Sequence, residues 1–273
     1  MDILEHELCA GIAAYYGVPE ERISLAAGRK ELLAAMLGGD GRFITSETDD
    51  ISSYVAPERV VCVPNLSDMR IDVDALLDTA AGDDTVMLTN PCLPTSLLTA
   101  EDDIARIAAG VNVVVDETYA LSRGQSAMRF AAESSRVSVM IELPFCGNIC
   151  FAVGKRTVRA GDISPEKLAA AGVVFSHPAA VRGAEKKLSD SAESLYIRIK
   201  KLAIKYESVE RLYRSRASFV FFAVKNAGER AEELEELGFK VRSDDGHLCT
   251  FAGTSEENNA FIPALQKVLE RIL

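Results

Sequence analysis

Two stretches of the sequence place polar residues where a ligand commonly binds in α/β proteins. Gly28, Arg29 and Lys30 open a helix-like segment, and the free N–H groups at such a helix start suit a phosphate. Asn90 ends an apolar run and begins an irregular turn at residues 90–96, in which two prolines restrict the backbone. Taken singly, a plain glycine turn and an ordinary loop explain these stretches equally well.

A third stretch joins an apolar strand-like run to carboxylates. Residues 113–115 are apolar, and the run ends in Asp116 and Glu117, with Tyr119 close behind. Ligands of open α/β sheets bind beyond the carboxyl ends of the strands, so Asp116 is a candidate binding residue. The alternative is a solvated carboxylate, or one that caps a neighbouring segment.

The elements that position these residues alternate between strand-like and helix-like patterns, which predicts an α/β fold with a mostly parallel, buried sheet. A 3.6-residue apolar stripe predicts a helix over residues 4–16 that Gly17 ends, and a second helix begins after Gly28. Thr99 is expected to cap a helix that closes at Gly110. Strands are expected at residues 59–64, 85–90, 111–116 and 137–143.

The C-terminal third follows a different pattern. Apolar residues spaced by three, four and seven predict one long amphipathic helix over residues 182–214. Strands at 219–224, 239–242 and 247–251 and helices at 228–237 and 255–273 then form a small α+β unit. We therefore expect a large domain at residues 1–205 and a small C-terminal domain at residues 206–273.

Composition excludes several classes of protein. The 273 residues are 48% hydrophobic, which is ample for a packed core. A net charge of −11 disfavours nucleic acid as a partner. No apolar run is long enough to span a membrane and no export signal is visible, so a cytoplasmic protein is expected. Residues 155–217 are the exception in charge, with 14 basic and 7 acidic residues, which indicates a solvated helix face or a site for an anionic partner.

Six cysteines form no CxxC pair and lie mostly in apolar segments, as expected of reduced thiols. If the fold brings Cys92, Cys146, Cys249 and His247 together, they offer a zinc site or a reactive thiolate. The alternative is that each cysteine is a small buried hydrophobe. The sequence leaves this choice open, and no metal site is assigned.

In their order and spacing, the three polar stretches resemble the fold-type I pyridoxal-phosphate (PLP) aminotransferases of class I/II, and among them the histidinol-phosphate aminotransferases. Residues 23–36 are similar to the family's glycine-led phosphate helix, and residues 89–96 to its Asn-Pro-x-x-Pro-Thr-Gly turn, with Ser96 in place of glycine. Residues 253–258 are similar to its closing Gly-Thr-x-Glu-Glu-Asn. The resemblance covers nearly the whole chain, although the family's N-terminal arm is missing.

The resemblance implies an aspartate-aminotransferase-like fold and a set of cofactor contacts. Gly28, Arg29 and Lys30 match the phosphate helix. Asn90 and Tyr119 match the residues that contact the cofactor's ring oxygen, and Asp116 matches the aspartate that pairs with its pyridine nitrogen. Such an aspartate keeps the nitrogen protonated, so that the ring can withdraw electrons from the substrate.

The chain differs from this family at the lysine on which transamination depends. Transamination requires a lysine that holds the aldehyde as an imine and moves the proton. No lysine occurs between Lys30 and Lys155, and the family's lysine position falls on Pro144 or Cys146. Lys155 lies too far along to serve at the same strand end unless residues 147–154 fold back.

Three further positions differ from the pattern that the resemblance implies. The phosphate-binding arginine falls near Ala152, and the arginine that holds the substrate carboxylate falls on Cys249. The ring-stacking aromatic is expected near residues 48–52, which contain Asp49 and Asp50. A thiol cannot replace the bidentate arginine, and an added acid would repel the anionic cofactor.

Three functions stay open at this point. The first is a degenerate aminotransferase-like pseudoenzyme with a regulatory or binding role, working as a homodimer or beside a related subunit. The second is a PLP-dependent aminotransferase that uses an atypical lysine or one from a partner. The third is a protein that binds PLP or another phosphorylated metabolite without a covalent bond.

Overall fold

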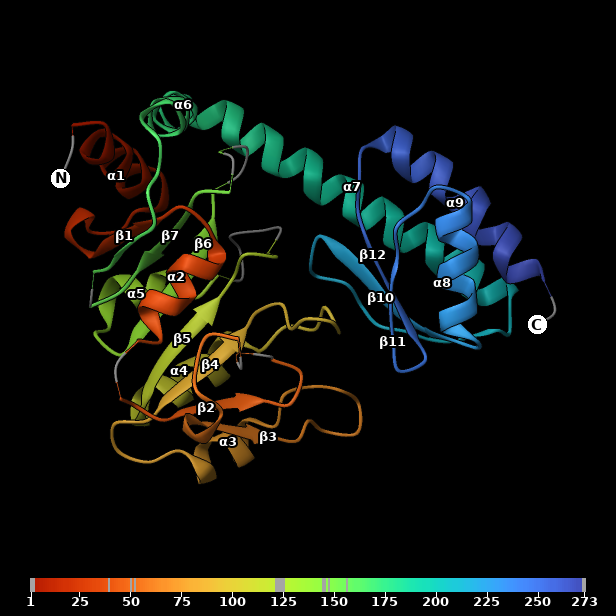
Figure 1. The fold of residues 1–273 in the computed structure, drawn as a ribbon, viewed down its shortest axis with the longest axis horizontal. Coiled ribbons are helices and arrows are strands. Elements are labelled where there is room, and N and C mark those ends of the chain that lie inside the picture. Colours follow the sequence, from red (N-terminus) through yellow and green to blue (C-terminus); the bar gives the residue numbers. More distant parts are fainter. Residues whose placement is uncertain are drawn as a thin grey trace. The chain divides into compact units, whose positions relative to one another are not determined.

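The computed structural model describes residues 3–38, 40–49, 51, 53–120, 126–143, 146, 148–155 and 157–271. These residues form two compact units (Figure 1). The second unit consists of Ala184–Leu273 together with the short stretches Pro91–Leu98 and Ala120–Ser122, and the first unit comprises the rest. The sequence-based boundary between residues 205 and 206 stays a prediction.

The first unit is built on an eight-stranded sheet in the order β3-β2-β4-β5-β6-β7-β1-β8. Its neighbouring strands run parallel except at β7, which is antiparallel to both β6 and β1. The expected α/β fold with a mostly parallel central sheet is thereby confirmed. The strands are β1 Ile23–Ala26, β2 Phe43–Ser46, β3 Val60–Val63, β4 Thr85–Thr89, β5 Asn112–Asp116, β6 Val137–Glu142, β7 Cys150–Val153 and β8 Arg159–Ala160.

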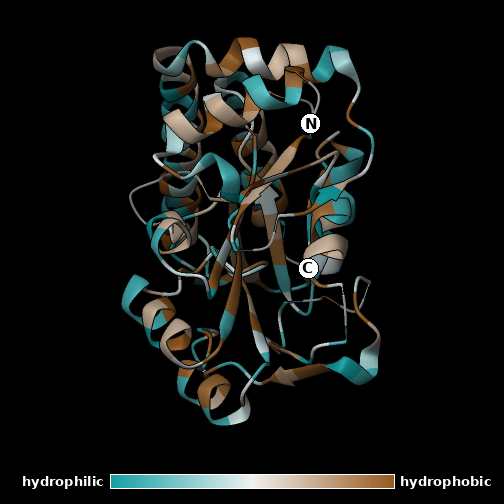
Figure 2. Ribbon diagram, turned by 90° about the vertical axis from the view of Figure 1, so that its left-hand side faces the viewer, coloured by the Kyte–Doolittle hydropathy of each residue, from teal (hydrophilic) through white to brown (hydrophobic). Residues whose placement is uncertain are grey.

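Helices cover both faces of this sheet because its central strands are apolar on both sides (Figure 2). In β5, Val113 and Val115 pack against the helices of one face, while Val114 packs with α2 on the other. The helices are α1 Ile3–Tyr16, α3 Val73–Thr79, α4 Glu101–Gly110, α5 Met128–Glu133 and α6 Pro165–Phe175 on the first face, and α2 Arg29–Met36 on the second.

The second unit holds a separate antiparallel sheet in the order β11-β12-β10-β9. A core of buried residues such as Leu195, Phe222 and Leu265 joins this sheet to its helices. The elements are α7 Pro178–Lys205, whose first residues belong to the first unit, β9 Val209–Leu212, β10 Phe219–Val224, α8 Ala227–Glu236, β11 Arg242–Asp244, β12 His247–Phe251 and α9 Ser255–Glu270.

Three local predictions need correction. Thr99 does not cap α4, whose N-cap is Ala100, and the Thr99 N–H instead donates to Asn90 Oδ1 at 2.9 Å. The long helix ends at Lys205 rather than near residue 214, because residues 209–212 pair with β10 as strand β9. The strand expected at 239–242 begins only at Arg242.

Ser96, which stands where the resembling family has glycine, has a φ of 61°. A left-handed backbone costs about 1–2 kcal/mol for a residue with a Cβ, whereas glycine adopts it freely. We therefore expect Ser96→Gly to raise the free energy of unfolding by about 0.5–1 kcal/mol once glycine's larger unfolded-state entropy is deducted. Chemical denaturation measures the change, with Ser176→Gly (φ −70°) as a control that should destabilise. A loss of stability in Ser96→Gly would contradict the expectation.

Candidate functional site

The sequence-predicted residues of the first unit meet at one edge of the sheet. Strands β1, β4, β5 and β6 run in the same direction, so their carboxyl ends lie at a common edge. Thr89 pairs with Asp116 across β4 and β5, which sets Asn90 beside Asp116, and the Asn90 N–H donates to the Asp116 carbonyl at 2.8 Å. Gly28 follows β1 and begins α2 at this edge.

Asp116 is fully buried, and its carboxylate is bound by side chains and backbone of this chain. Arg29 donates to Oδ2 from Nε at 2.7 Å and approaches the same oxygen with Nη2 at 2.6 Å. The N–H and the hydroxyl of Thr118 donate to Oδ1 at 3.0 and 2.7 Å. Arg29 and Asp116 thus form an ion pair between residues that are 87 positions apart in the sequence.

Two tyrosines and a glutamate surround this ion pair. The Tyr119 ring centre lies 5.8 Å from Arg29 Cζ, and Tyr54 Oη lies 3.4 Å from Arg29 Nη1. Burial raises the pKa of Tyr119, and burial together with Asp116 raises the pKa of Glu142 at the end of β6. The sequence reasoning overlooked Tyr54 and Glu142, although the aromatic Tyr54 lies close after Asp49 in the chain.

Asp49 and Asn90 bring unsatisfied polar atoms to the same place. The Thr89 N–H donates to Asp49 Oδ2 at 3.1 Å, while Asp49 Oδ1 and Asn90 Nδ2 are buried and have no hydrogen-bond partner among the described residues. Burial raises the pKa of Asp49 to about 7, against the lowering effect of the Thr89 hydrogen bond. Asp50, the second acid expected here, lies outside the described residues.

Glu117 is a second buried acid at this edge, and the structure gives it a structural partner. It accepts a hydrogen bond from the Ala127 N–H at 2.7 Å and one from the Ser126 hydroxyl, just before α5 begins. Burial raises the pKa of Glu117 to about 7, although both hydrogen bonds lower it. Its contacts therefore indicate that Glu117 anchors the start of α5.

The start of α2 carries a carboxylate of its own. Gly28 is the extended N-cap, and Lys30, next to Arg29, is exposed. A Cβ placed at Gly28 would lie 2.7 Å from Glu31 Oε2, so this side chain lies against the helix start. An acid at a helix N-terminus is favoured by the helix dipole, but it opposes the binding of a phosphate at the same point.

The lysine position of the resembling family carries no amine. Pro144 lies outside the described residues, whereas Cys146 is 5% exposed and packs in the core of the first unit. Residues 148–154 do fold back, because β7 returns antiparallel to β6, with Glu142 beside Cys150 and Val139 beside Val153. That reversal carries Lys155 away from the edge that holds Asp116. Ala152, at the expected phosphate arginine, is buried within β7.

Five of the six cysteines are buried, whereas Cys62 is exposed. Burial raises the pKa of Cys146 to about 11 and that of Cys249 to about 12, so neither is a ready thiolate at neutral pH. Cys92 is buried in the turn that follows Asn90. Within the described ranges, no three His, Cys, Asp or Glu side chains are grouped so as to hold a metal ion.

Cys249 and His247 lie on β12 in the second unit. Cys249 pairs with Phe221 of β10 and Arg242 of β11, and it is 3% exposed. The His247 ring stacks on Phe221 with centroids 4.6 Å apart, and its Nδ1 lies 2.7 Å from the Asp245 carbonyl oxygen. These contacts give both residues a packing role.

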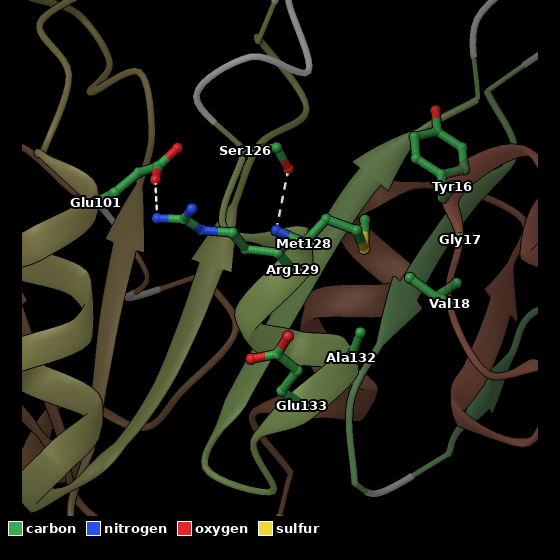
Figure 3. Close-up of a pocket in the computed structure, with 9 residues that line it drawn as sticks. All are labelled: Tyr16, Gly17, Val18, Glu101, Ser126, Met128, Arg129, Ala132 and Glu133. Carbon is green, nitrogen blue, oxygen red and sulfur yellow. Dashed lines mark hydrogen bonds and ion pairs between the residues drawn. The ribbon is translucent and has the colours of Figure 1, made fainter.

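A pocket of about 390 Å³ lies elsewhere on the first unit (Figure 3). Its only described cation, Arg129, is ion-paired with Glu101, and Glu133 adds a further acid to the wall. Ser126, on the same wall, hydrogen-bonds the buried Glu117. With more acid than base on its lining, this pocket is poorly suited to a phosphorylated ligand.

The residues at the sheet edge fit a bound PLP only in part. The unsatisfied Asn90 Nδ2 would suit a ring oxygen. However, no lysine occurs at residues 31–154, which include β2 to β6 and every loop between them, and the Asp116 carboxylate is already paired with Arg29. PLP held as an imine by a residue of this segment therefore does not fit the residues present.

Comparison with solved structures identifies the class of fold. A putative histidinol-phosphate aminotransferase from Erwinia carotovora atroseptica superposes with a TM-score of 0.81 at 18% identity, covering 98% of this chain and 87% of that one. The Sinorhizobium meliloti histidinol-phosphate aminotransferase in complex with pyridoxal-5'-phosphate gives 0.80 at 18% identity, covering 98% and 82%. The chain has the fold of the fold-type I PLP-dependent aminotransferases.

Sequence relatives narrow this relationship. The histidinol-phosphate aminotransferase of Chlorobaculum tepidum is 28% identical over 98% of this chain and 84% of its own length. The histidinol-phosphate aminotransferase of Corynebacterium glutamicum strain R is 29% identical over 98% of this chain and 80% of its own length. No family model matches the sequence. The chain is thus related to histidinol-phosphate aminotransferases. In the part of the chain that the structure describes, no helix is long and apolar enough to cross a membrane.

Proposed function

We propose that this chain is an aminotransferase-like pseudoenzyme, which does not carry out transamination and instead has a regulatory or binding role. The observation that carries the proposal is the lack of any lysine from residue 31 to residue 154, the segment that supplies strands β2 to β6 and their carboxyl ends. Without an amine on these strands or on the loops between them, no side chain of this segment can hold an aldehyde or move the proton that transamination requires.

The surrounding residues support this proposal. Arg29 neutralises Asp116 at the point where the resembling family binds a ring nitrogen. Asp49 adds a buried acid nearby, and Glu31 lies against the helix start that would bind a phosphate. Arg29, Asp116 and Asn90 are held in place by hydrogen bonds within the chain, as a structural or binding role requires.

The relatives favour a second candidate, an active PLP-dependent aminotransferase. Histidinol-phosphate aminotransferases of Chlorobaculum tepidum and Corynebacterium glutamicum match nearly the whole of this chain. Such an enzyme would need Lys30, Lys155 or a lysine from a partner. Lys30 is the nearer of the two, since it adjoins Arg29 on α2, whereas Lys155 follows the reversed strand β7.

A reductive trap separates the two candidates. The protein is incubated with PLP and then with borohydride, which converts any imine into a stable pyridoxyl-lysine, and the peptides are weighed by mass spectrometry. We expect no lysine to be labelled at one equivalent per chain. One equivalent on a single lysine, lost in the matching Lys30→Met or Lys155→Met variant, would overturn the pseudoenzyme proposal.

Two further features are part of the proposal. We infer a dimer, either of two copies or with a related subunit, because the resembling family builds its sites between subunits. We also infer a cytoplasmic location, which the six free cysteines support. Light scattering on the purified protein measures the first of these.

A further inference from the structure

The acceptor positions of the Asp116 carboxylate are all used within the chain. Each carboxylate oxygen has about two lone-pair directions for hydrogen bonds. Thr118 supplies two donors to Oδ1, and Arg29 supplies two nitrogens to Oδ2. A further donor, such as the N–H of a protonated ring, would have to displace one of these groups.

Arg29 is the partner that lies toward solvent. Its side chain is 26% exposed, whereas that of Asp116 is fully buried. The guanidinium is a permanent, planar cation with donors along its edge, and it lies near the Tyr119 ring and the Tyr54 hydroxyl. Like a protonated nitrogen heterocycle, it is flat, positively charged and able to donate N–H groups from its edge.

Local structure explains why Arg29 reaches this position. Gly28 ends the extended chain after β1, so Arg29 is the first residue of α2 and its side chain projects from the helix start. The neighbouring Lys30 is exposed, and no ion pair is recorded for it among the described residues. The ion pair therefore depends on the residue at position 29 and not on a general basic patch.

We propose that Arg29 is a built-in counter-ion that occupies the place of a ligand cation at Asp116 and excludes protonated nitrogen heterocycles from this sheet edge. The inference rests on the proposed function, because a chain without an imine-forming lysine gains nothing from leaving Asp116 open. It also explains why the buried carboxylate can persist in a protein without the cofactor, since an unpaired buried charge is strongly destabilising.

The test uses pyridoxine 5'-phosphate, which has the pyridine nitrogen and the phosphate but no aldehyde. This ligand cannot form an imine with a lysine. A negative result in this test therefore refutes the role of Arg29 without deciding the outcome of the borohydride trap. Equilibrium dialysis should show at least tenfold tighter binding to Arg29→Ala than to the unaltered protein. Adding Asp116→Asn should remove the gain, and Lys30→Ala should not produce it.

Binding to the unaltered protein as tight as to Arg29→Ala would overturn the proposal, as would a gain that survives Asp116→Asn. Because Arg29→Ala removes the ion pair with the buried Asp116 and lowers stability, a second measurement uses the unaltered chain. The Arg29 Nε–H resonance, assigned by its loss in Arg29→Lys, should not shift when pyridoxine 5'-phosphate is added. A saturable shift of that resonance would equally refute the proposal.

Discussion

Arg29→Ala is expected to lower the free energy of unfolding by about 3–5 kcal/mol, because it leaves the Asp116 carboxylate buried without its cation. Chemical denaturation at neutral pH measures this loss. The matched control is Arg106→Ala, which breaks an exposed pair with Asp74 and should cost at most about 1 kcal/mol.

A double variant checks the cause of that loss. Arg29→Met combined with Asp116→Asn removes both charges, and its stability should recover toward that of the unaltered protein. Equal losses for Arg29→Ala and Arg106→Ala would contradict the expectation, since they would mean that Asp116 is solvated once Arg29 is removed.

Asp49→Asn is expected to be more stable than the unaltered protein, by an amount that grows as the pH rises from about 4 to 7. The pKa of Asp49 is raised to about 7 by burial, whereas an unfolded aspartate titrates near 3.9. From about pH 4 to pH 7 the folded state retains a proton that the unfolded chain has lost, so this residue lowers stability as the pH increases. Above pH 7 the ionised Asp49 lowers the free energy of unfolding by its full amount, which is at most roughly 4 kcal/mol.

Denaturation of the two proteins from pH 4 to pH 8 tests this sign. The stability difference should be small near pH 4 and should grow up to pH 7 in favour of Asp49→Asn. Glu117, whose pKa is also raised to about 7, keeps its own pH dependence in both proteins. Asp40→Asn, at an exposed aspartate, is the control, and a constant difference between Asp49→Asn and the unaltered protein would refute the expectation.

The elements that carry the candidate site were predictable because their signals are local. The apolar runs that end at Thr89 and Asp116 are strands, and the glycine at position 28 begins a helix as expected. Parallel strand direction then suffices to bring Asn90 and Asp116 to one edge. The order of these motifs also indicated the relationship that the comparisons support.

The contacts that change the chemistry were not predictable, because they join distant positions. Nothing local to Arg29 indicates that its side chain meets Asp116, and nothing near Asp49 shows that it is buried. The predicted Thr99 cap was wrong because α4 begins one residue later, with Ala100 as its N-cap, and the Thr99 N–H donates to Asn90 Oδ1 instead. Such contacts depend on hydrogen bonds between residues that are far apart in the sequence. No spacing pattern within a single sequence indicates them.

Because the chain reverses at β7, the lysine that an aldehyde labels indicates at which edge of the sheet the aldehyde reacts. Because Lys155 follows a strand that runs opposite to β6, a modified amine there would mark the far margin of the sheet. One equivalent of label on Lys155 would place the reactive amine at that far margin, whereas one equivalent on Lys30 would place it on the helix that begins beside Asp116. The position of the labelled lysine thus shows whether an imine forms beside Asp116 or at the opposite edge of the sheet.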